Sequence, residues 1–141
     1  MSRKKGFVLT YSEYPFIPPH GIFVFASNLA GLHIAGPARF ASDNYGAIDG
    51  QAAGLQGRSY AIPVKDEDLK PIPVSDVKKH VDRFIGFARG YPHLRFVLIP
   101  PGLAEITAGA PRHASLFDGA PHNVIRPKLW PAQLFTALEI D

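Results

Sequence analysis

The chain has 141 residues and a mass of 15.4 kDa, which fits one domain, and a domain of this size buries about 68% of its unfolded surface. It contains no cysteine, which excludes disulfides, thiolate catalysis and cysteine–zinc sites, and no apolar run approaches the length of about 18 residues that spans a bilayer. The formal net charge is +3, and Arg3, Lys4 and Lys5 supply much of this excess. We therefore expect a single cytoplasmic domain over residues 1–141, with residues 1–6 as a flexible basic tail and no membrane contact.

The first elements are expected before residue 45. The segment Phe7 to Tyr11 has the pattern of a strand, and Ser12 to His20 contains three prolines that favour an extended connection. Ile22 to Phe25 form a short, unbroken apolar run, which is typical of a strand that is covered on both faces. A helix is then predicted over Pro37 to Asn44, and its buried face would carry Ala38, Ala41 and Tyr45.

The middle of the chain is rich in glycine and proline. Tyr45 to Arg58 has four glycines in fourteen residues, which predicts an irregular surface loop. Ser59 to Val64 is predicted to be a strand that Pro63 ends, and Lys65 to Val74 is predicted to be a charged link.

A helix over Asp76 to Arg89 is the clearest prediction. Ser75 is the expected N-cap, Asp76 suits the positive end of the helix dipole, and Gly90 marks the end. Apolar residues recur at helical spacing along this segment, namely Val77, Val81, Phe84, Ile85 and Ala88.

The last third alternates short apolar runs with breaks. Arg95 to Ile99 is a predicted buried strand, and two prolines and a glycine follow it directly. A short helix is expected over Pro111 to Phe117, a strand over Asn123 to Ile125, and a further helix or strand over Trp130 to Ile140. Because strands alternate with helices, the expected architecture is an α/β fold with a mostly parallel sheet.

The stretch from Gly21 to Phe40 carries the main functional signal. A buried strand runs into a loop with Asn28, Gly31 and Gly36, and Pro37 then opens a helix. In open α/β sheets, such a strand–loop–helix unit points unpaired backbone N–H groups outward and binds phosphate groups. The stretch therefore predicts a phosphate-bearing ligand.

Three motifs in order resemble the macro domain family, particularly a small phage and bacterial macro-like branch. They are SNLAG-x-H-x-AG-x-A at Ser27 to Ala38, GLQG-x-SYAIP at Gly54 to Pro63, and NV-x-x-P-x-x-W at Asn123 to Trp130. The resemblance implies a three-layer α/β/α fold with a mixed, mostly parallel sheet. It also implies a site for ADP-ribose or an ADP-ribosylated target, and in some members hydrolysis of the ADP-ribose linkage.

The resemblance also implies the site residues. Asn28 and His33 are the implied catalytic residues, with Asn28 orienting the distal ribose or an attacking water. The implied ligand-binding residues lie in two loops, with Ser27, Gly31, Ala35 and Gly36 in the first and Pro101, Gly102, Leu103 and Ala104 in the second. No cofactor is implied.

Some positions depart from the family pattern. Ile34 is bulkier than the glycine expected there, Pro101 lacks an N–H for a phosphate oxygen, and Glu105 adds a negative charge. These departures support an alternative, a non-enzymatic interaction domain that keeps the macro-like scaffold with a degenerate pocket.

Each candidate side chain also has a structural interpretation. Asn28 is suited to a tight turn at a strand end, and His33 could be a loop histidine that bonds the local backbone.

Other polar and aromatic residues give weaker functional signals. Asp43 and Asp49 are candidate acids or bases that nothing in the sequence places in a cleft. The aromatic residues Tyr60, Phe117 and Trp130 are more typical of a core than of a base-stacking site. The histidine spacings indicate no metal site, and the modest charge disfavours nucleic acid as a partner.

Overall fold

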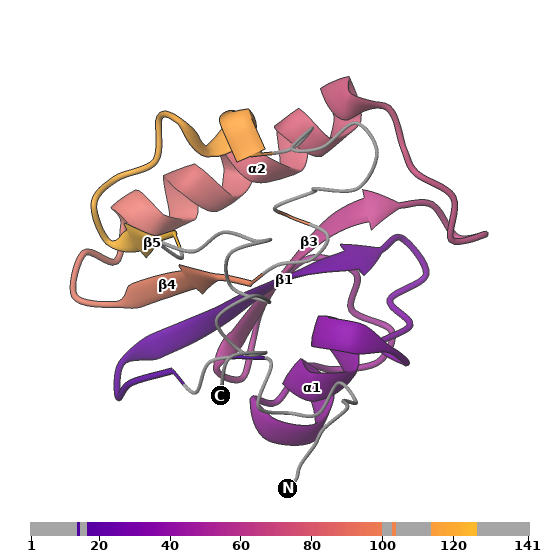
Figure 1. Cartoon of the computed structure of the whole chain (residues 1–141), viewed down its shortest axis with the longest axis horizontal. Helices are drawn as coiled ribbons and strands as arrows, with labels where there is room; N and C mark the ends of the chain where they lie inside the picture. The colour runs from indigo at the N-terminus through magenta and orange to yellow at the C-terminus, as the bar shows by residue number, and fades with distance from the viewer. Residues whose placement is uncertain (1–13, 15–16, 100–102, 104–113, 127–141) are drawn as a thin grey trace, which may run out of the picture.

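The computed structural model describes residues 14, 17–99, 103 and 114–126 (Figure 1). The ordered elements are β1 (Gly21–Asn28), α1 (Gly36–Asn44), β2 (Gly54–Gln56), β3 (Ser59–Lys65), α2 (Val74–Arg89), β4 (Arg95–Leu98), the 3₁₀ helix η2 (Ala114–Phe117) and β5 (Val124–Ile125). The predictions for residues 1–6, Phe7 to Tyr11 and Trp130 to Ile140 lie outside the described residues.

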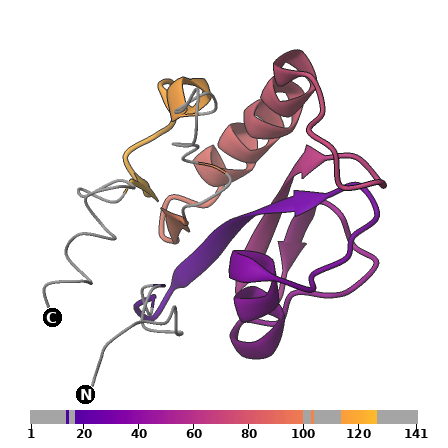
Figure 2. The ribbon, with the colours of Figure 1, turned by 45° about the vertical axis from the view of Figure 1, so that its right-hand side comes forward.

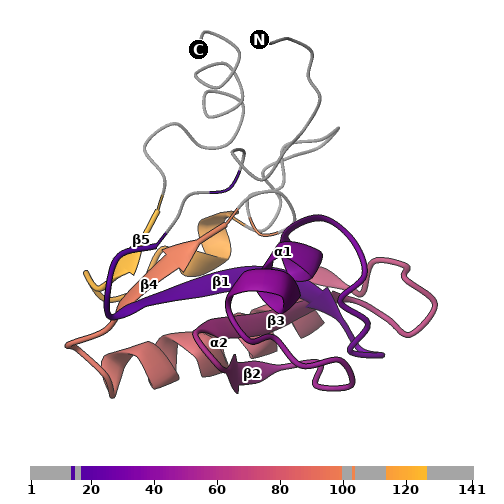
Figure 3. The ribbon, with the colours of Figure 1, turned by 90° about the horizontal axis from the view of Figure 1, so that it is seen from below.

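Five strands form one mixed sheet in the order β2-β3-β1-β4-β5. Figure 3 shows this order from β5 on one side to β2 on the other. Strand β1 pairs in parallel with β3 and with β4, and β5 is parallel to β4, whereas β2 is antiparallel to β3. The predicted α/β class with a mixed, mostly parallel sheet is therefore confirmed.

Apolar side chains of β1 alternate between two clusters on opposite faces of the sheet. Ile22 and Val24 belong to the cluster that contains α2, and Phe23 and Phe25 belong to the cluster that contains α1. Figure 2 shows the sheet between these two helices. All four side chains are buried, as the unbroken apolar run predicted for a strand covered on both faces.

Helix α2 buries the predicted apolar stripe completely. Its start differs from the prediction, because the helix begins at Val74 after Pro73, and no side chain caps its first turn, so the prediction of Ser75 as N-cap was wrong. Pro73 occupies the N-cap position, where its fixed φ directs the chain into the helix without a capping side chain. The end at Gly90 agrees with the prediction. In the part of the chain that the structure describes, no helix combines the length and apolar content needed to span a bilayer.

Two predictions around the glycine-rich segment were also wrong. Residues 45–58 are not wholly irregular, because Gly54–Gln56 form β2. Pro63 does not end its strand, since β3 continues to Lys65. The β2–β3 ladder stops at Ala61, so the missing N–H of Pro63 lies beyond the last pair of that ladder.

The remaining elements are shorter than predicted. Within the predicted helix over Pro111 to Phe117, the described part is the single 3₁₀ turn η2, and β5 begins one residue after Asn123. Asn123 instead donates its side-chain amide to the carbonyl oxygens of Ala88, at 3.1 Å, and Tyr91, at 3.0 Å, so it ties β5 to the end of α2.

Phe84 is the aromatic centre of the α2 face. Its ring lies 5.0 Å from Tyr60, 5.6 Å from Phe96 and 6.1 Å from Phe117, measured between centroids. Tyr60 and Phe117 are buried here, so the core interpretation of these two aromatics agrees with the structure.

We predict that Phe84→Ala lowers the free energy of unfolding by about 3–5 kcal/mol, because it leaves a cavity among buried rings. Urea denaturation is the measurement, and Phe87→Ala is the control, since Phe87 is only partly buried and packs at the edge of the same cluster. A loss for Phe84→Ala no larger than for Phe87→Ala would contradict this account of the core.

Candidate functional site

The carboxyl ends of the parallel strands β1, β3 and β4 meet at one edge of the sheet. From there the chain after β1 leads to α1 on one face, and the chain after β3 leads to α2 on the other (Figure 1). Neighbouring strands that send their connections to opposite faces define the position where open α/β sheets bind ligands. The candidate site is therefore the loop between β1 and α1, residues 29–35.

Asn28 closes the turn that starts this loop. Its side-chain Nδ2 donates to the carbonyl oxygen of Leu32 at 2.9 Å, and its Oδ1 accepts from the backbone N–H of Leu32 at 3.1 Å. The N–H of Gly31 donates to the backbone oxygen of Asn28 at 3.0 Å. The residue predicted to orient ribose or water thus binds its own loop in the structure.

Gly31 lies where the β1–α1 loop crosses the loop of residues 46–53. It has a φ of +72°, and a Cβ atom built on it would lie 2.6 Å from the carbonyl carbon of Gly50. Gly50 in turn donates its N–H to the Gly31 oxygen at 2.9 Å. The two loops therefore approach closely enough that only glycine fits at position 31 without movement of the backbone.

Gln56 and His33 form a buried polar cluster below this crossing. The His33 Nε2 lies 3.1 Å from Gln56 Oε1 and 3.2 Å from the carbonyl oxygen of Gln51. Gln56 Oε1 also accepts from the backbone N–H of Ile48 at 2.7 Å, while its Nε2 donates to the Gln51 oxygen at 3.1 Å. One glutamine on β2 therefore joins the β1–α1 loop and the loop of residues 46–53 to its own strand.

His33 is an internal anchor in this structure. It is 2% exposed, and its ring lies edge-on to Phe25 with centroids 5.2 Å apart. Because both partners of Nε2 are oxygen atoms, Nε2 must carry the hydrogen. Its Nδ1 is buried and has no hydrogen-bond partner among the residues that the structure describes. The imidazole is thus closed off from solvent. A histidine that transfers protons to or from a substrate has to be accessible to that substrate, and His33 is not.

Two further bonds complete the connection between the loops. The Ser27 hydroxyl donates to the carbonyl oxygen of Ala52, and the backbone N–H of His33 donates to Asp49 Oδ1 at 3.0 Å. Asp49, a candidate acid or base in the sequence, therefore serves as a loop acceptor. Of the residues predicted to contact a ligand, Ser27 and Gly31 are buried, whereas Ala35 and Gly36 are exposed.

The exposed backbone lies at the start of α1. Ala35 is the N-cap in an extended conformation, no side chain caps the helix, and Pro37 is in the first turn. A Cβ atom on Gly36 would meet nothing closer than the Tyr14 hydroxyl at 3.8 Å, so this part of the loop is open to an approaching group. Backbone N–H groups in the first turn of a helix have no intrahelical acceptor.

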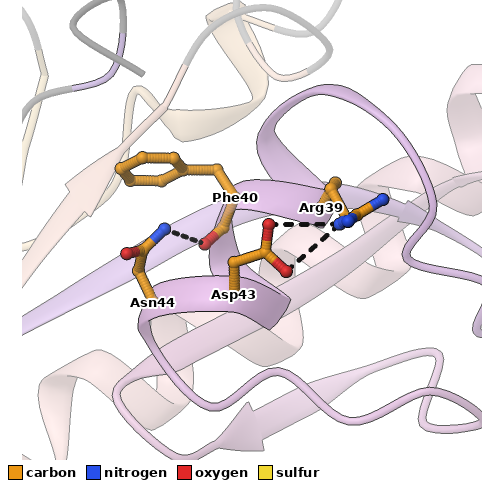
Figure 4. A network of polar contacts seen from close by, with 4 residues as sticks. All are labelled: Arg39, Phe40, Asp43 and Asn44. Atoms are coloured by element: carbon orange, nitrogen blue, oxygen red, sulfur yellow. Dashed lines mark hydrogen bonds and ion pairs between the residues drawn. The ribbon is translucent and has the colours of Figure 1, made fainter. Parts of the chain in front are cut away.

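The outer surface of α1 is occupied by polar contacts within the helix (Figure 4). Arg39 Nε lies 3.1 Å from both carboxylate oxygens of Asp43, and Asn44 donates its side-chain amide to the Phe40 carbonyl oxygen at 3.0 Å. Asp43 is thus ion-paired on an exposed helix surface, which gives no support to its candidate role as an acid or base.

The second predicted loop is described at one position. Pro101, Gly102 and Ala104 lie outside the described residues, and Leu103 is fully buried in the cluster that contains α2. The side chain of Leu103 is therefore part of the core rather than of an open surface.

Sequence reasoning missed Lys65, which ends β3 beside Asn28. The two residues are paired in the β1–β3 register, and the Leu29 N–H donates to the Lys65 oxygen at 2.9 Å. Lys65 is exposed, and its ammonium group has no carboxylate partner within the described ranges. Its position directly after a predicted strand was the available signal, but the parallel pairing that brings it to Asn28 was not visible in the sequence.

No protein-family model, curated protein or solved structure matches the chain. Across residues 14, 17–99, 103 and 114–126, no three histidine, aspartate or glutamate side chains are placed to hold a metal ion.

We predict that Gly31→Ala destabilises the protein more than Gly50→Ala does. Both glycines have positive φ, which costs another residue about 1–2 kcal/mol, but an added Cβ at Gly50 meets nothing within 4 Å. The clash at Gly31 should add a further loss of about 1–3 kcal/mol. Urea denaturation of the two variants checks this, and equal losses would contradict the close crossing of the loops.

Proposed function

We propose that the protein binds a phosphate-bearing ligand of the ADP-ribose type at the carboxyl edge of the sheet. The observation that carries the proposal is the glycine loop between β1 and α1, which lies where neighbouring strands send their connections to opposite faces. The first turn of α1 carries the backbone N–H groups of Gly36 and Ala38 near this edge, although Pro37 supplies none, and N–H groups at a helix start favour anions.

The hydrogen bonds between the loops support binding because they hold the β1–α1 loop in one conformation. The backbone of Gly31 and the side chain of His33 take part in these bonds, and the side chain of Asn28 closes the turn within the β1–α1 loop. A loop that is already ordered loses less conformational entropy when a ligand binds. The internal roles of these residues are thus compatible with a binding site that they shape without contacting the ligand.

Lys65 supplies a positive charge at the same edge. Because its ammonium group has no carboxylate partner among the residues described, it is available to a phosphate oxygen. The backbone of the loop is open to solvent near Gly36, whereas at Gly31 it packs closely against Gly50.

The proposal is for binding rather than for hydrolysis. Catalysis would require a general base or a water-orienting group free to face the substrate, and the amide of Asn28 and the imidazole of His33 both bond within the loops. Asp43 and Asp49 are also engaged, by Arg39 and by the His33 N–H respectively.

We predict that Lys65→Ala weakens ADP-ribose binding about two- to fivefold, because an exposed ion pair contributes up to about 1 kcal/mol. Isothermal titration calorimetry measures the affinity. Lys79→Ala is the matched control, since Lys79 is an exposed lysine on α2 that pairs with Asp76, and it should leave the affinity unchanged.

Titrations with AMP and with ribose 5-phosphate show which part of the ligand is recognised. An absence of saturable heat with ADP-ribose, AMP and ribose 5-phosphate would refute the proposal.

A second candidate function, a non-enzymatic protein-interaction domain, is supported by apolar side chains on the same loop. Leu32 is 43% exposed and Ile34 is 60% exposed, whereas a diphosphate-binding loop needs a small side chain at position 34. The effect of replacing Ile34 therefore differs between the two proposed functions.

If ADP-ribose binds, we predict that Ile34→Ala tightens binding by about threefold or more, because a smaller side chain lets the ligand approach the loop. Ile48→Ala is the control, since Ile48 is 52% exposed on the adjacent loop. Calorimetry on both variants checks this. Weaker binding by Ile34→Ala would show that Ile34 contacts the ligand instead of obstructing it.

A further inference from the structure

A cavity of about 130 Å³ lies between α2 and the edge of the sheet formed by β2 and β3. Tyr60 of β3 and His80 and Arg83 of α2 line it, and the backbone at Ala53 and Gly54 closes another side. The cavity lies at the β2–β3 edge of the sheet, whereas the β1–α1 loop follows β1 in the middle of the sheet. It is therefore a second candidate place for a ligand.

The spacing along α2 brings His80 and Arg83 to one face of the helix, because residues three apart are neighbours on its surface. The Nδ1 atom of His80 is inaccessible to solvent and has no hydrogen-bond partner among the described residues, so it lies behind the cavity wall rather than on it. The His80 side chain itself lines the cavity, so its imidazole can report on a ligand there.

Arg83 has no carboxylate partner in the described part of the chain, although α2 carries two aspartates near it. Asp82 bonds to Lys78 at 2.7 Å, and Asp76 lies 3.7 Å from Lys79. Both aspartates are therefore paired with lysines, and the exposed Arg83, which lines the cavity, is available to an anion.

Tyr60 is held rigidly at the inner wall. Its ring packs against Phe84 at 5.0 Å and Phe87 at 5.3 Å. Burial raises the pKa of the Tyr60 hydroxyl, and the charge of Arg83 opposes this rise. Tyr60 and Arg83 both line the cavity, so the two groups border the same small volume.

We propose that this cavity binds a single oxyanion, a phosphate or carboxylate group carried by a small ligand. Among the described residues, three polar side chains line it and can all donate hydrogen bonds, and no carboxylate does. Arginine is the side chain best suited to bind two oxygens of one such group.

The size of the cavity limits the ligand. A cavity of about 150 Å³ is known to hold one benzene molecule, so this one accepts one anionic group and a few further atoms. A dinucleotide does not fit, which distinguishes this cavity from the proposed ADP-ribose site.

The test is a titration of the full chain with sodium sulfate, followed by NMR of the His80 imidazole at constant ionic strength. Sulfate is the first probe because its charge is constant over the pH range of histidine. Acetate and phenyl phosphate, in parallel titrations, separate a carboxylate preference from a phosphate preference. Saturable shifts with any of the three would support the proposal.

Arg83→Gln should weaken binding by about tenfold or more, because it removes a charged hydrogen-bond donor. Arg89→Gln is the matched control on the same helix, where the exposed Arg89 donates to the Gly119 carbonyl oxygen at 2.7 Å, and its affinity should equal that of the unchanged protein. Tyr60→Phe removes only the hydroxyl and should give a smaller loss.

The pH dependence provides an independent readout. Burial lowers the pKa of His80 below its usual value, the charge of Arg83 lowers it further, and Asp76 opposes the change. Tyr60 is the titratable group that faces the cavity from β3. A bound anion favours the protonated imidazole, so sulfate should raise the pKa of His80 and bind more tightly as the pH falls through it.

Two results would overturn the proposal. One is the absence of saturable shifts at His80 with all three anions. The other is an equal loss of affinity in Arg83→Gln and Arg89→Gln, which would show a general charge effect.

Discussion

The side chains of strand β1 are buried from Ile22 to Phe25, so both faces of the strand need apolar cover. Its backbone N–H and carbonyl groups are buried with them, so the strand also needs a hydrogen-bonded neighbour on each side. β3 and β4 provide the two neighbouring strands, and α1 and α2 provide the cover. The right-handed crossovers that connect such strands require the two helices to lie on opposite faces. The candidate site at the carboxyl edge is a consequence of this requirement.

The polar side chains at that edge show how a glycine-rich connection is stabilised in a small domain. Gln56 is buried on β2 and bonds to His33, Ile48 and Gln51. Irregular loops lack the regular backbone hydrogen bonds of helices and strands, and this one side chain supplies hydrogen bonds in their place. Both polar atoms of the Gln56 side chain have partners, and hydrogen bonds of this kind rigidify their surroundings. These hydrogen bonds hold the β1–α1 loop in one conformation, and they also engage the His33 imidazole, so His33 is not free to contact a ligand.

The two proposed sites differ in how they recognise an anion. At the carboxyl edge, backbone N–H groups and a single exposed lysine face an open surface, which suits an extended ligand. In the cavity beside β3, an arginine, a tyrosine and a histidine surround a small volume, which suits one compact group.

Local sequence patterns were sufficient for the elements that depend on periodic burial. The stripe from Val77 to Ala88 predicted α2, and the apolar run at Ile22 predicted β1, because side-chain spacing and backbone period are linked within a few residues. The turn at Asn28 was one of the interpretations open from the sequence, since its side chain bonds Leu32 only four residues on. The contact of His33 with Gln56, the continuation of β3 through Pro63 and the approach of Lys65 to Asn28 could not be predicted in this way. They depend on which strands pair and how closely two loops cross, and those contacts join residues far apart in the chain, where spacing carries no information.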